Sequence, residues 1–203
     1  MMKNIFLVDV DTQRDFMLSG GALYVPGAER MIPKLRRLFD FARKNEISIL
    51  STMDAHAPND PEFQQFPPHC VRGTEGQRKI DETQLPRPLI LSTKPVDRNL
   101  MEAVRKHPQI IVEKQALDAF SNPMLPRLLR VLPQHAIVFG VTTEYCVKLA
   151  CLGIRRAGVP VALVTDAIRA LTPKAEKEAL EEMRGAGVEF ITLETLLGSV
   201  TVE

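Results

Sequence analysis

Seven short apolar runs rich in β-branched residues recur along the chain, and amphipathic segments separate them. Runs without polar alternation are typical of strands buried on both faces of a parallel sheet. The helical spacing of apolar residues between them predicts helices that cover such a sheet. The alternation therefore predicts an α/β fold with a doubly wound, largely parallel sheet. The predicted strands cover residues 5–10, 47–53, 89–91, 110–112, 136–141, 159–164 and 188–193.

A chain of 203 residues has the size of one domain, so we expect a single domain over residues 1–203. Residues 54–88 differ from the rest, because they are rich in proline, aspartate, glutamine and glycine and follow neither period. So long an aperiodic segment in a compact domain is usually functional or disordered. Since it begins where a predicted strand ends, we expect residues 54–88 to form an active-site and metal-binding loop.

Charge and hydropathy restrict the partners of the protein. The 26 basic and 25 acidic side chains nearly cancel, which leaves no electrostatic basis for binding nucleic acid or an anionic membrane. The chain has neither a long apolar span nor an apolar signal sequence at its start, so we expect a cytoplasmic protein. The three cysteines form no C-x-x-C pair, which favours reduced thiols. Small molecules and other proteins therefore remain as the candidate partners.

Cys146 follows the predicted strand 136–141 and stands where a strand turns into a helix. With Thr143 as the N-cap, the thiol would lie in the first helical turn, where free N–H groups and the helix dipole favour thiolate. Cys146 is therefore our candidate nucleophile. Cys151 lies on an apolar helical stripe, and we expect it and Cys70 to be small buried side chains.

Charged residues follow two other predicted strands. Asp9, Asp11 and Asp15 surround the exit of the first strand, and Lys114 follows strand 110–112. Alone, these residues are most simply a turn cap and surface charges. The carboxyl ends of strands in an open α/β sheet share one crevice, however. A carboxylate, a lysine and Cys146 meeting there would supply a proton acceptor, a stabilising cation and a nucleophile, although spacing does not select the aspartate.

Asp54 and His56 stand two residues apart in an Asp-x-His motif, and His69 follows in the same loop. A motif this short more often consists of hydrogen-bonded loop residues than of metal ligands. Three such ligands with an open position nevertheless describe a catalytic divalent metal site of zinc type. Asp60 and Glu62 lie in the same loop and are further residues that could approach the metal.

Aromatic residues near these motifs are candidates for substrate contacts. An isolated phenylalanine is more often part of a core, but a flat ring packs well between two aromatic faces. The chain has two tyrosines and no tryptophan, so few residues could form such a clamp. We expect Phe16, Phe66 and Tyr145 to contact the substrate.

The ordered set of motifs resembles the isochorismatase-like cysteine hydrolases, with the nicotinamidases as the most similar members. Each motif is weak alone, but their order is specific and extends over most of the chain. The motifs are Val-Asp-Thr-Gln-Arg-Asp-Phe at residues 10–16, Asp-x-His at 54–56, Pro-Pro-His-Cys at 67–70, Glu-Lys at 113–114 followed by Ala-Phe-Ser at 119–121, and Gly-Val-Thr-Thr-Glu-Tyr-Cys-Val at 140–147.

The resemblance implies a three-layer αβα fold around a six-stranded, largely parallel sheet. It also implies a catalytic triad of Asp11, Lys114 and Cys146, in which the Asp-x-Gln-x-Asp-Phe spacing selects Asp11 over Asp9. The peptide bond between Val141 and Thr142 would be cis, with the backbone N–H groups of Thr142 and Cys146 forming an oxyanion hole.

For the metal, the resemblance implies Asp54, His56 and His69 as ligands. We expect a divalent cation, zinc first, with iron or manganese as alternatives. Some nicotinamidases carry a further histidine in the region where this chain has Glu62, so a fourth protein ligand stays open. The family's habit also implies a homo-oligomer.

The implied activity is cysteine-dependent hydrolysis of a small carboxamide, with nicotinamide cleaved to nicotinate and ammonia through a thioester, a reaction of pyridine nucleotide metabolism. A hydrolase of N-carbamoyl or other small amides could use the same three residues. An isochorismatase-type hydrolase is a further alternative, although such enzymes need no cysteine nucleophile. A non-catalytic binding protein on this fold is the alternative of another class.

Overall fold

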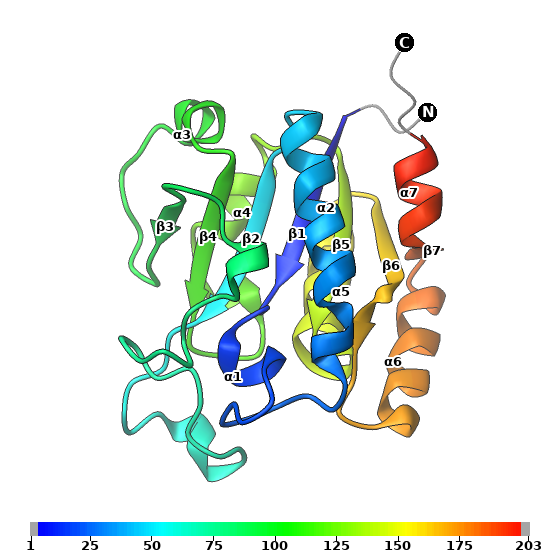
Figure 1. Ribbon diagram of the computed structural model, residues 1–203. Helices are drawn as coiled ribbons and strands as arrows, with labels where there is room; N and C mark the ends of the chain where they lie inside the picture. Colours follow the sequence, from blue (N-terminus) through cyan, green and yellow to red (C-terminus); the bar gives the residue numbers. More distant parts are fainter. Residues whose placement is uncertain (1–3, 200–203) are drawn as a thin grey trace.

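A parallel sheet of seven strands forms the centre of the computed structural model, which describes residues 4–199 (Figure 1). All neighbouring strands pair in parallel, in the order β3-β4-β2-β1-β5-β6-β7. Residues 1–3 and 200–203 of the predicted domain lie outside the described residues. The strands are β1 (Ile5–Val10), β2 (Ile49–Asp54), β3 (Leu89–Leu91), β4 (Gln109–Lys114), β5 (His135–Val141), β6 (Val161–Arg169) and β7 (Glu189–Ile191).

The count of six strands implied by the family resemblance is wrong for this chain. The outermost strands, β3 and β7, are three residues long, and each pairs with its inner neighbour. Each of the seven apolar runs in the sequence corresponds to one of the strands. The residue pattern therefore predicts the sheet better than the family comparison does, while the αβα layering holds.

Helices cover both faces of the sheet. The apolar side chains of α2 and α7 pack in one cluster, and those of α3, α4, α5 and α6 pack in the other. The amphipathic spacing predicted between the first two strands is confirmed in α2, where Leu35, Leu38, Phe39 and Ala42 are buried. The α-helices are α1 (Arg14–Met17), α2 (Ile32–Lys44), α3 (Leu100–Lys106), α4 (Leu125–Leu129), α5 (Lys148–Arg156), α6 (Pro173–Gly185) and α7 (Leu193–Ser199).

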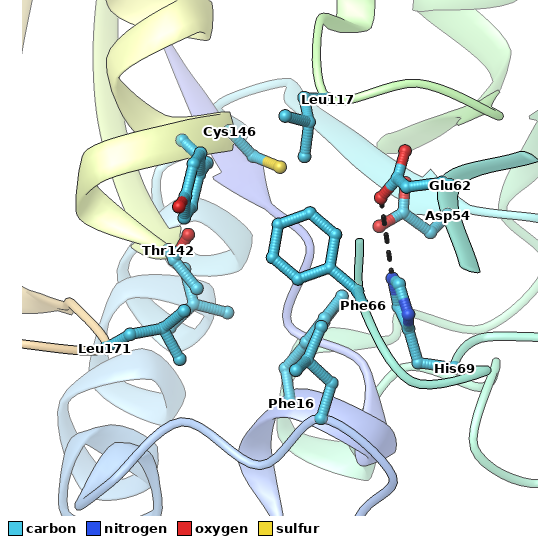
Figure 2. A pocket seen from close by; sticks show the side chains of 12 residues that line it. Phe16, Asp54, Glu62, Phe66, His69, Leu117, Thr142, Cys146 and Leu171 are labelled. Atoms are coloured by element: carbon cyan, nitrogen blue, oxygen red, sulfur yellow. Dashed lines mark ion pairs between the residues drawn. The ribbon is translucent and has the colours of Figure 1, made fainter. Parts of the chain in front are cut away.

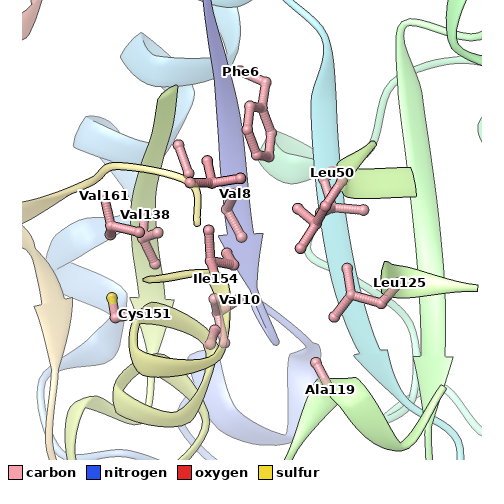
Figure 3. Close-up of a cluster of buried hydrophobic side chains, with 14 of the residues drawn as sticks. Phe6, Val8, Val10, Leu50, Ala119, Leu125, Val138, Cys151, Ile154 and Val161 are labelled. Carbon is pink, nitrogen blue, oxygen red and sulfur yellow. The ribbon is translucent and has the colours of Figure 1, made fainter. Parts of the chain in front are cut away.

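The larger apolar cluster lies between β1, β2, β5 and the helix α5 (Figure 3). Phe6, Val8 and Val10 alternate along β1 and point into it, whereas Ile5 and Leu7 belong to the opposite cluster. This alternation is what a strand buried on both faces requires. Within residues 4–199 there are also five short helical turns: the 3₁₀-helices η1 (Ala28–Met31), η2 (Pro61–Gln64), η3 (Asp81–Thr83) and η4 (Ala119–Ser121), and the π-helix η5 (Thr143–Val147).

The strand order places a crevice at the carboxyl ends of β1 and β5. Successive strands extend to one side from β1 through β2 and to the other from β5 onward, so the chain direction across the sheet reverses between them. Ligands of open α/β sheets bind at such a switch point. β1 and β5 lie close together here, since a Cβ added at Gly140 (φ +123°) would lie 2.1 Å from the carbonyl oxygen of Val10.

Candidate functional site

The strand ends bring four reactive side chains together. Asp11 follows β1, Asp54 and Lys114 end β2 and β4, and Cys146 lies in η5 after β5. The parallel register of β2 and β4 places Asp54 directly beside Lys114. All four residues are buried, with at most 7% of their surface exposed. The carboxylates, the ammonium and the thiol therefore interact in a medium that water screens little.

The ammonium group of Lys114 is the centre of this cluster. Its Nζ lies 3.0 Å from Asp11 Oδ2 and 3.5 Å from the sulfur of Cys146, and it donates to Asp54 Oδ1. Burial alone would lower the pKa of Lys114, but the carboxylates of Asp11 and Asp54 outweigh it and raise that pKa well above its ordinary value. Lys114 is therefore a fixed positive charge between two carboxylates and a thiol.

The local structure at Cys146 differs from the predicted helix start. Thr143 is not an N-cap: its hydroxyl has no hydrogen-bond partner within residues 4–199, and Thr142, in extended conformation, precedes the helical segment. That segment opens as a π-helix, in which Val147 N donates to Thr142 O. Because the π-turn is wider than an α-turn, the sulfur position depends on this bulge, as is common at functional sites.

The thiol of Cys146 does not have the low pKa that the helix start predicts. Burial raises its pKa well above the ordinary value; Lys114 opposes this shift, whereas Asp11 and Asp54 add to it. The thiol and Asp11 Oδ2 both lie beside the Lys114 ammonium. The sequence argument considered only the helix dipole and did not include burial beside two carboxylates. The structure favours a protonated thiol next to Asp11.

The structure distinguishes Asp11 from Asp9, which spacing alone could not do. The carboxylate of Asp9 lies 2.8 Å from Lys79 Nζ and also accepts from Thr12 and Ser51. Asp11 faces Lys114 instead, with Oδ2 toward the ammonium. Its Oδ1 accepts from the hydroxyl of Thr52 at 2.6 Å.

The predicted metal ligands Asp54, His56 and His69 also converge. One ligand atom from each residue lies within 4.8 Å of the others, and all three side chains are buried. Nε2 of His56 has no hydrogen-bond partner within residues 4–199, whereas Nδ1 faces Asp60 Oδ2 at 3.0 Å. A buried imidazole nitrogen without a partner is costly, and a cation bound by the three side chains would satisfy Nε2. The donor set of one carboxylate and two imidazoles suits a divalent metal of zinc type.

Neighbouring groups orient the proposed metal ligands and set their protonation. His69 Nδ1 lies 2.8 Å from the carbonyl oxygen of Pro67, which leaves Nε2 free to coordinate. Burial lowers the pKa of His69 and so favours the neutral, metal-binding imidazole. Burial also raises the pKa of Asp54 to about 7, although Lys114 opposes this shift. A metal would therefore compete with a proton for Asp54.

Glu62 approaches the same position from η2. Its Oε1 lies 3.9 Å from His56 Nε2 and 3.8 Å from His69 Nε2, and Figure 2 shows its carboxylate beside that of Asp54. Asp60 instead lies behind His56, 3.0 Å from Nδ1. Cys70 is buried outside the ligand group, with its sulfur 3.9 Å from Gly76 O. Of these three residues, Glu62 is therefore the one whose side chain approaches Nε2 of both histidines.

A small apolar pocket, with a cavity volume of about 20 Å³, joins the two halves of the site (Figure 2). Cys146 lies on one side, and Asp54, Glu62 and His69 lie on the other. The remaining walls are Phe16, Phe66 and Tyr145, which the sequence singled out, and Leu23, Leu117, Val141, Thr142 and Leu171.

Two of the aromatic walls, Phe66 and Tyr145, meet nearly at a right angle. The rings of Phe66 and Tyr145 are 5.7 Å apart at 85°, and the ring of Phe16 lies 5.3 Å from that of His69. The peptide bond between Val141 and Thr142, at the base of the pocket, is cis. Sequence analysis missed Leu23, Leu117 and Leu171, because leucines in loops carry no signal that distinguishes a pocket wall from ordinary packing.

None of the helices between residues 4 and 199 has the length and apolar composition that a membrane span needs.

Comparison with known proteins is consistent with this geometry. The nicotinamidase of Escherichia coli is 27% identical over 92% of this chain and 94% of its own length. The nicotinamidase/pyrazinamidase of Mycobacterium tuberculosis is 26% identical over 91% of this chain and 97% of its length. The crystal structure of the pyrazinamidase of Pyrococcus horikoshii in complex with zinc has a TM-score of 0.78, with 29% identity over 94% of this chain and 99% of that chain.

A family profile describes nearly the whole chain. The isochorismatase domain matches residues 6–104 and 90–195, which include all the residues of the site described above. The chain therefore belongs to the isochorismatase family of hydrolases.

Proposed function

We propose that the protein hydrolyses the amide C–N bond of a small aromatic carboxamide, with nicotinamide as the substrate and nicotinate and ammonia as the products. The observation that carries this proposal is one pocket with two reactive sides. Cys146, in contact with the lysine that also pairs with Asp11, lies on one side, and Asp54 and His69, which converge with His56, lie on the other. The nicotinamidases and pyrazinamidases among the relatives support the same reaction.

In the first half of the proposed reaction, Asp11 takes the proton of the Cys146 thiol as sulfur attacks the carboxamide carbon. The backbone N–H groups of Thr142 and Cys146 bind the oxyanion. The C–N bond then breaks, and ammonia leaves with the proton that Asp11 had accepted. The raised thiol pKa supports this order, because a buried thiol needs a base in contact with it to become nucleophilic.

In the second half, Asp11 accepts a proton from a water molecule that attacks the thioester, and it returns that proton to the sulfur as the acid departs. Lys114 stabilises the negative charge that alternates between Asp11 and Cys146, since its Nζ contacts both side chains. One carboxylate thus serves as base and acid in both halves.

We propose Asp54, His56 and His69 as metal ligands, with Glu62 as the fourth and zinc as the metal. When bound, the metal would coordinate the ring nitrogen of the substrate and orient its carboxamide. The pocket supports this arrangement, because His69 and Glu62 lie on the wall opposite Cys146. Phe16, Phe66 and Tyr145 would enclose the ring in aromatic contacts.

The lining of the pocket disfavours the two rival substrates. Ureido acids and isochorismate carry carboxylates, which need a cation or several donors when they are buried. Within residues 4–199, no lysine or arginine lines this pocket, whereas Asp54 and Glu62 do. Lys114 is already held by Asp11 and Asp54. Apart from the proposed metal, which would take the ring nitrogen, the described lining offers no cation to such a carboxylate, so an uncharged aromatic amide is the substrate class that this lining favours.

A substrate screen tests the proposal. Ammonia release would be measured with nicotinamide, pyrazinamide, a ureido acid and, by product analysis, isochorismate. We expect turnover of the two aromatic amides and none of the anionic substrates. Turnover of the ureido acid alone would instead identify a carbamoyl amidase.

A non-catalytic binding protein would release no ammonia from any of these amides. Mass spectrometry of the wild-type protein during turnover of nicotinamide provides an independent check. We expect an acyl adduct on Cys146 when the reaction is quenched in acid, and its absence together with slow turnover would exclude the covalent route.

We further propose that the protein is a cytoplasmic homo-oligomer that forms a single domain. Sedimentation velocity of the purified protein tests the assembly, and a single monomeric species would contradict it.

A further inference from the structure

We propose that Gln13 and Asp15 are positioning residues that hold the two parts of the metal site together. This inference rests on the proposed function, because it takes Asp54, His56 and His69 to be metal ligands. These ligands come from two separate segments: Asp54 and His56 at the end of β2, and His69 within the loop. Both segments are bonded to the side chains of the turn that follows Asp11.

Gln13 holds the first segment. Its Oε1 accepts from the backbone N–H of Asp54 at 2.7 Å, and its Nε2 donates to the backbone carbonyl of Asp54 at 2.9 Å. The same Nε2 donates to the carbonyl of Gln77 at 2.8 Å. The amide thus pairs with both backbone groups of a proposed ligand, as a neighbouring strand would, and Gln13 is fully buried.

Asp15 holds the second segment. Its Oδ2 accepts from the backbone N–H of Cys70, the residue after His69, at 2.7 Å, and its Oδ1 accepts from Ala22 N at 3.0 Å. Within residues 4–199, no cation lies within ion-pair distance of this carboxylate, so its charge acts on backbone amides. The loop makes room for it, because a Cβ at Gly76 would lie 2.2 Å from Oδ2.

Metal affinity depends on such supporting contacts. Partners that orient metal ligands, although they do not touch the metal, typically contribute about 10–100-fold to metal affinity. Here Gln13 fixes the backbone from which the Asp54 carboxylate extends, and Asp15 fixes the backbone next to His69. A change of either side chain would let one group of ligands move relative to the other.

Arg14, between the two positioning residues, provides a matched control. Its guanidinium forms ion pairs with Glu75 at 3.5 Å and with Asp81 at 2.9 Å. It therefore helps to hold the same loop, but none of its side-chain bonds reaches a proposed ligand or its neighbour. If this turn served only to stabilise the loop, the Arg14 variant would lose as much Zn²⁺ affinity as the Gln13 and Asp15 variants.

The experiment measures Zn²⁺ affinity of metal-free protein by competition with a chromophoric chelator. We expect Gln13→Met and Asp15→Asn to weaken Zn²⁺ binding by roughly 10–100-fold and Arg14→Met to leave it nearly unchanged. Excess Zn²⁺ should restore nicotinamide turnover in the first two variants, because the residues around Cys146 are intact. Where Gln13→Met does not fold, Gln13→Glu, which retains one acceptor, is measured instead.

The outcomes separate this inference from the proposed function. Wild-type protein that binds no Zn²⁺ would refute the metal site itself. Tight Zn²⁺ binding by the wild type and by both variants would refute the positioning role and leave the proposed reaction standing. Equal weakening in all three variants, including Arg14→Met, would also refute it, because the turn would then only stabilise the loop.

Discussion

Lys79 with Asp9 and Lys114 with Asp11 form two buried ion pairs of similar length, 2.8 Å and 3.0 Å, but only the second contacts a thiol. Both lysine side chains are fully buried. Asp9 also accepts from two hydroxyl groups, so its carboxylate is fully engaged. Asp11 accepts from one hydroxyl group on Oδ1, and its Oδ2 is shared with Lys114 beside Cys146.

The comparison shows that burial of a charged pair does not identify a reactive site. A carboxylate with fixed donors on both oxygens, such as Asp9, can hold segments together but is poorly placed to accept another proton. Asp11, whose Oδ2 has no hydrogen-bond partner within residues 4–199 and which lies next to a thiol, can accept that proton. We therefore expect the first pair to stabilise the fold and the second to serve the reaction, which the following predictions test.

The largest effect is expected from the loss of the nucleophile. Cys146→Ala should reduce ammonia release from nicotinamide by roughly 10⁴-fold or more, as removal of other enzymatic nucleophiles does. Cys151→Ala is the control, because Cys151 is fully buried in the apolar cluster. Near-normal turnover by the Cys146 variant would exclude the covalent mechanism.

Lys79→Met should break the pair that has no catalytic role. The variant leaves Asp9 buried without its cation, so we expect the free energy of unfolding to fall by about 3–5 kcal/mol in urea titrations. The double variant with Asp9→Asn should recover part of this loss. Turnover per folded molecule should stay close to wild type, and a folded but inactive Lys79 variant would remove the distinction between the two pairs.

The thiol of Cys146 should gain reactivity steadily with pH. Because burial and the nearby carboxylates raise its pKa, little thiolate exists at pH 7, and the thiolate fraction grows as the pH rises. Iodoacetamide alkylation, followed by mass spectrometry of the Cys146 peptide, should therefore accelerate by about 100-fold between pH 7 and 9. A rate that is already constant above pH 7 would mean a preformed thiolate and contradict the structure.

Thr52→Val should have the smallest effect of these changes. The valine fills the same space but removes the hydroxyl that donates to Asp11 Oδ1. Loss of a hydrogen bond to a charged group costs about 1.5–3 kcal/mol, so turnover should fall by roughly 10- to 150-fold. Thr52→Ser, which keeps the hydroxyl, should retain most activity; equal loss in both variants would point to packing instead.

The sequence predicts the central elements well, because strands buried on both faces and amphipathic helices have strong apolar periods. The ends of the strands are predicted less accurately. β6 extends to Arg169 rather than ending at residue 164, and the strand predicted to start at residue 47 begins at Ile49. Strand ends depend on neighbours that lie far away in the sequence. Lys114 and Cys146 could be named beforehand because each one follows or ends a recognisable strand, whereas the choice of Asp11 over Asp9 came from the family resemblance.

Other features of the site depend on long-range contacts that no local pattern encodes. The pairing of Asp9 with Lys79 connects β1 to the loop, and spacing around Asp9 could not indicate it. Burial of Cys146 beside two carboxylates reverses the pKa shift that its position after β5 suggests. The approach of Glu62 to both histidines depends on how η2 packs on the strand ends.

The reacting groups and the residues that shape the pocket come from different parts of the fold, which has an evolutionary consequence. The proposed reacting groups are carried by the ends of β1, β4 and β5, which the sheet fixes in place, whereas Phe66, Leu117 and Leu171 shape the pocket from connecting segments. Replacing these three can alter which amide is accepted without moving the reacting atoms. Descendants of such a chain can therefore acquire new substrates by a few substitutions while they retain the ancestral chemistry.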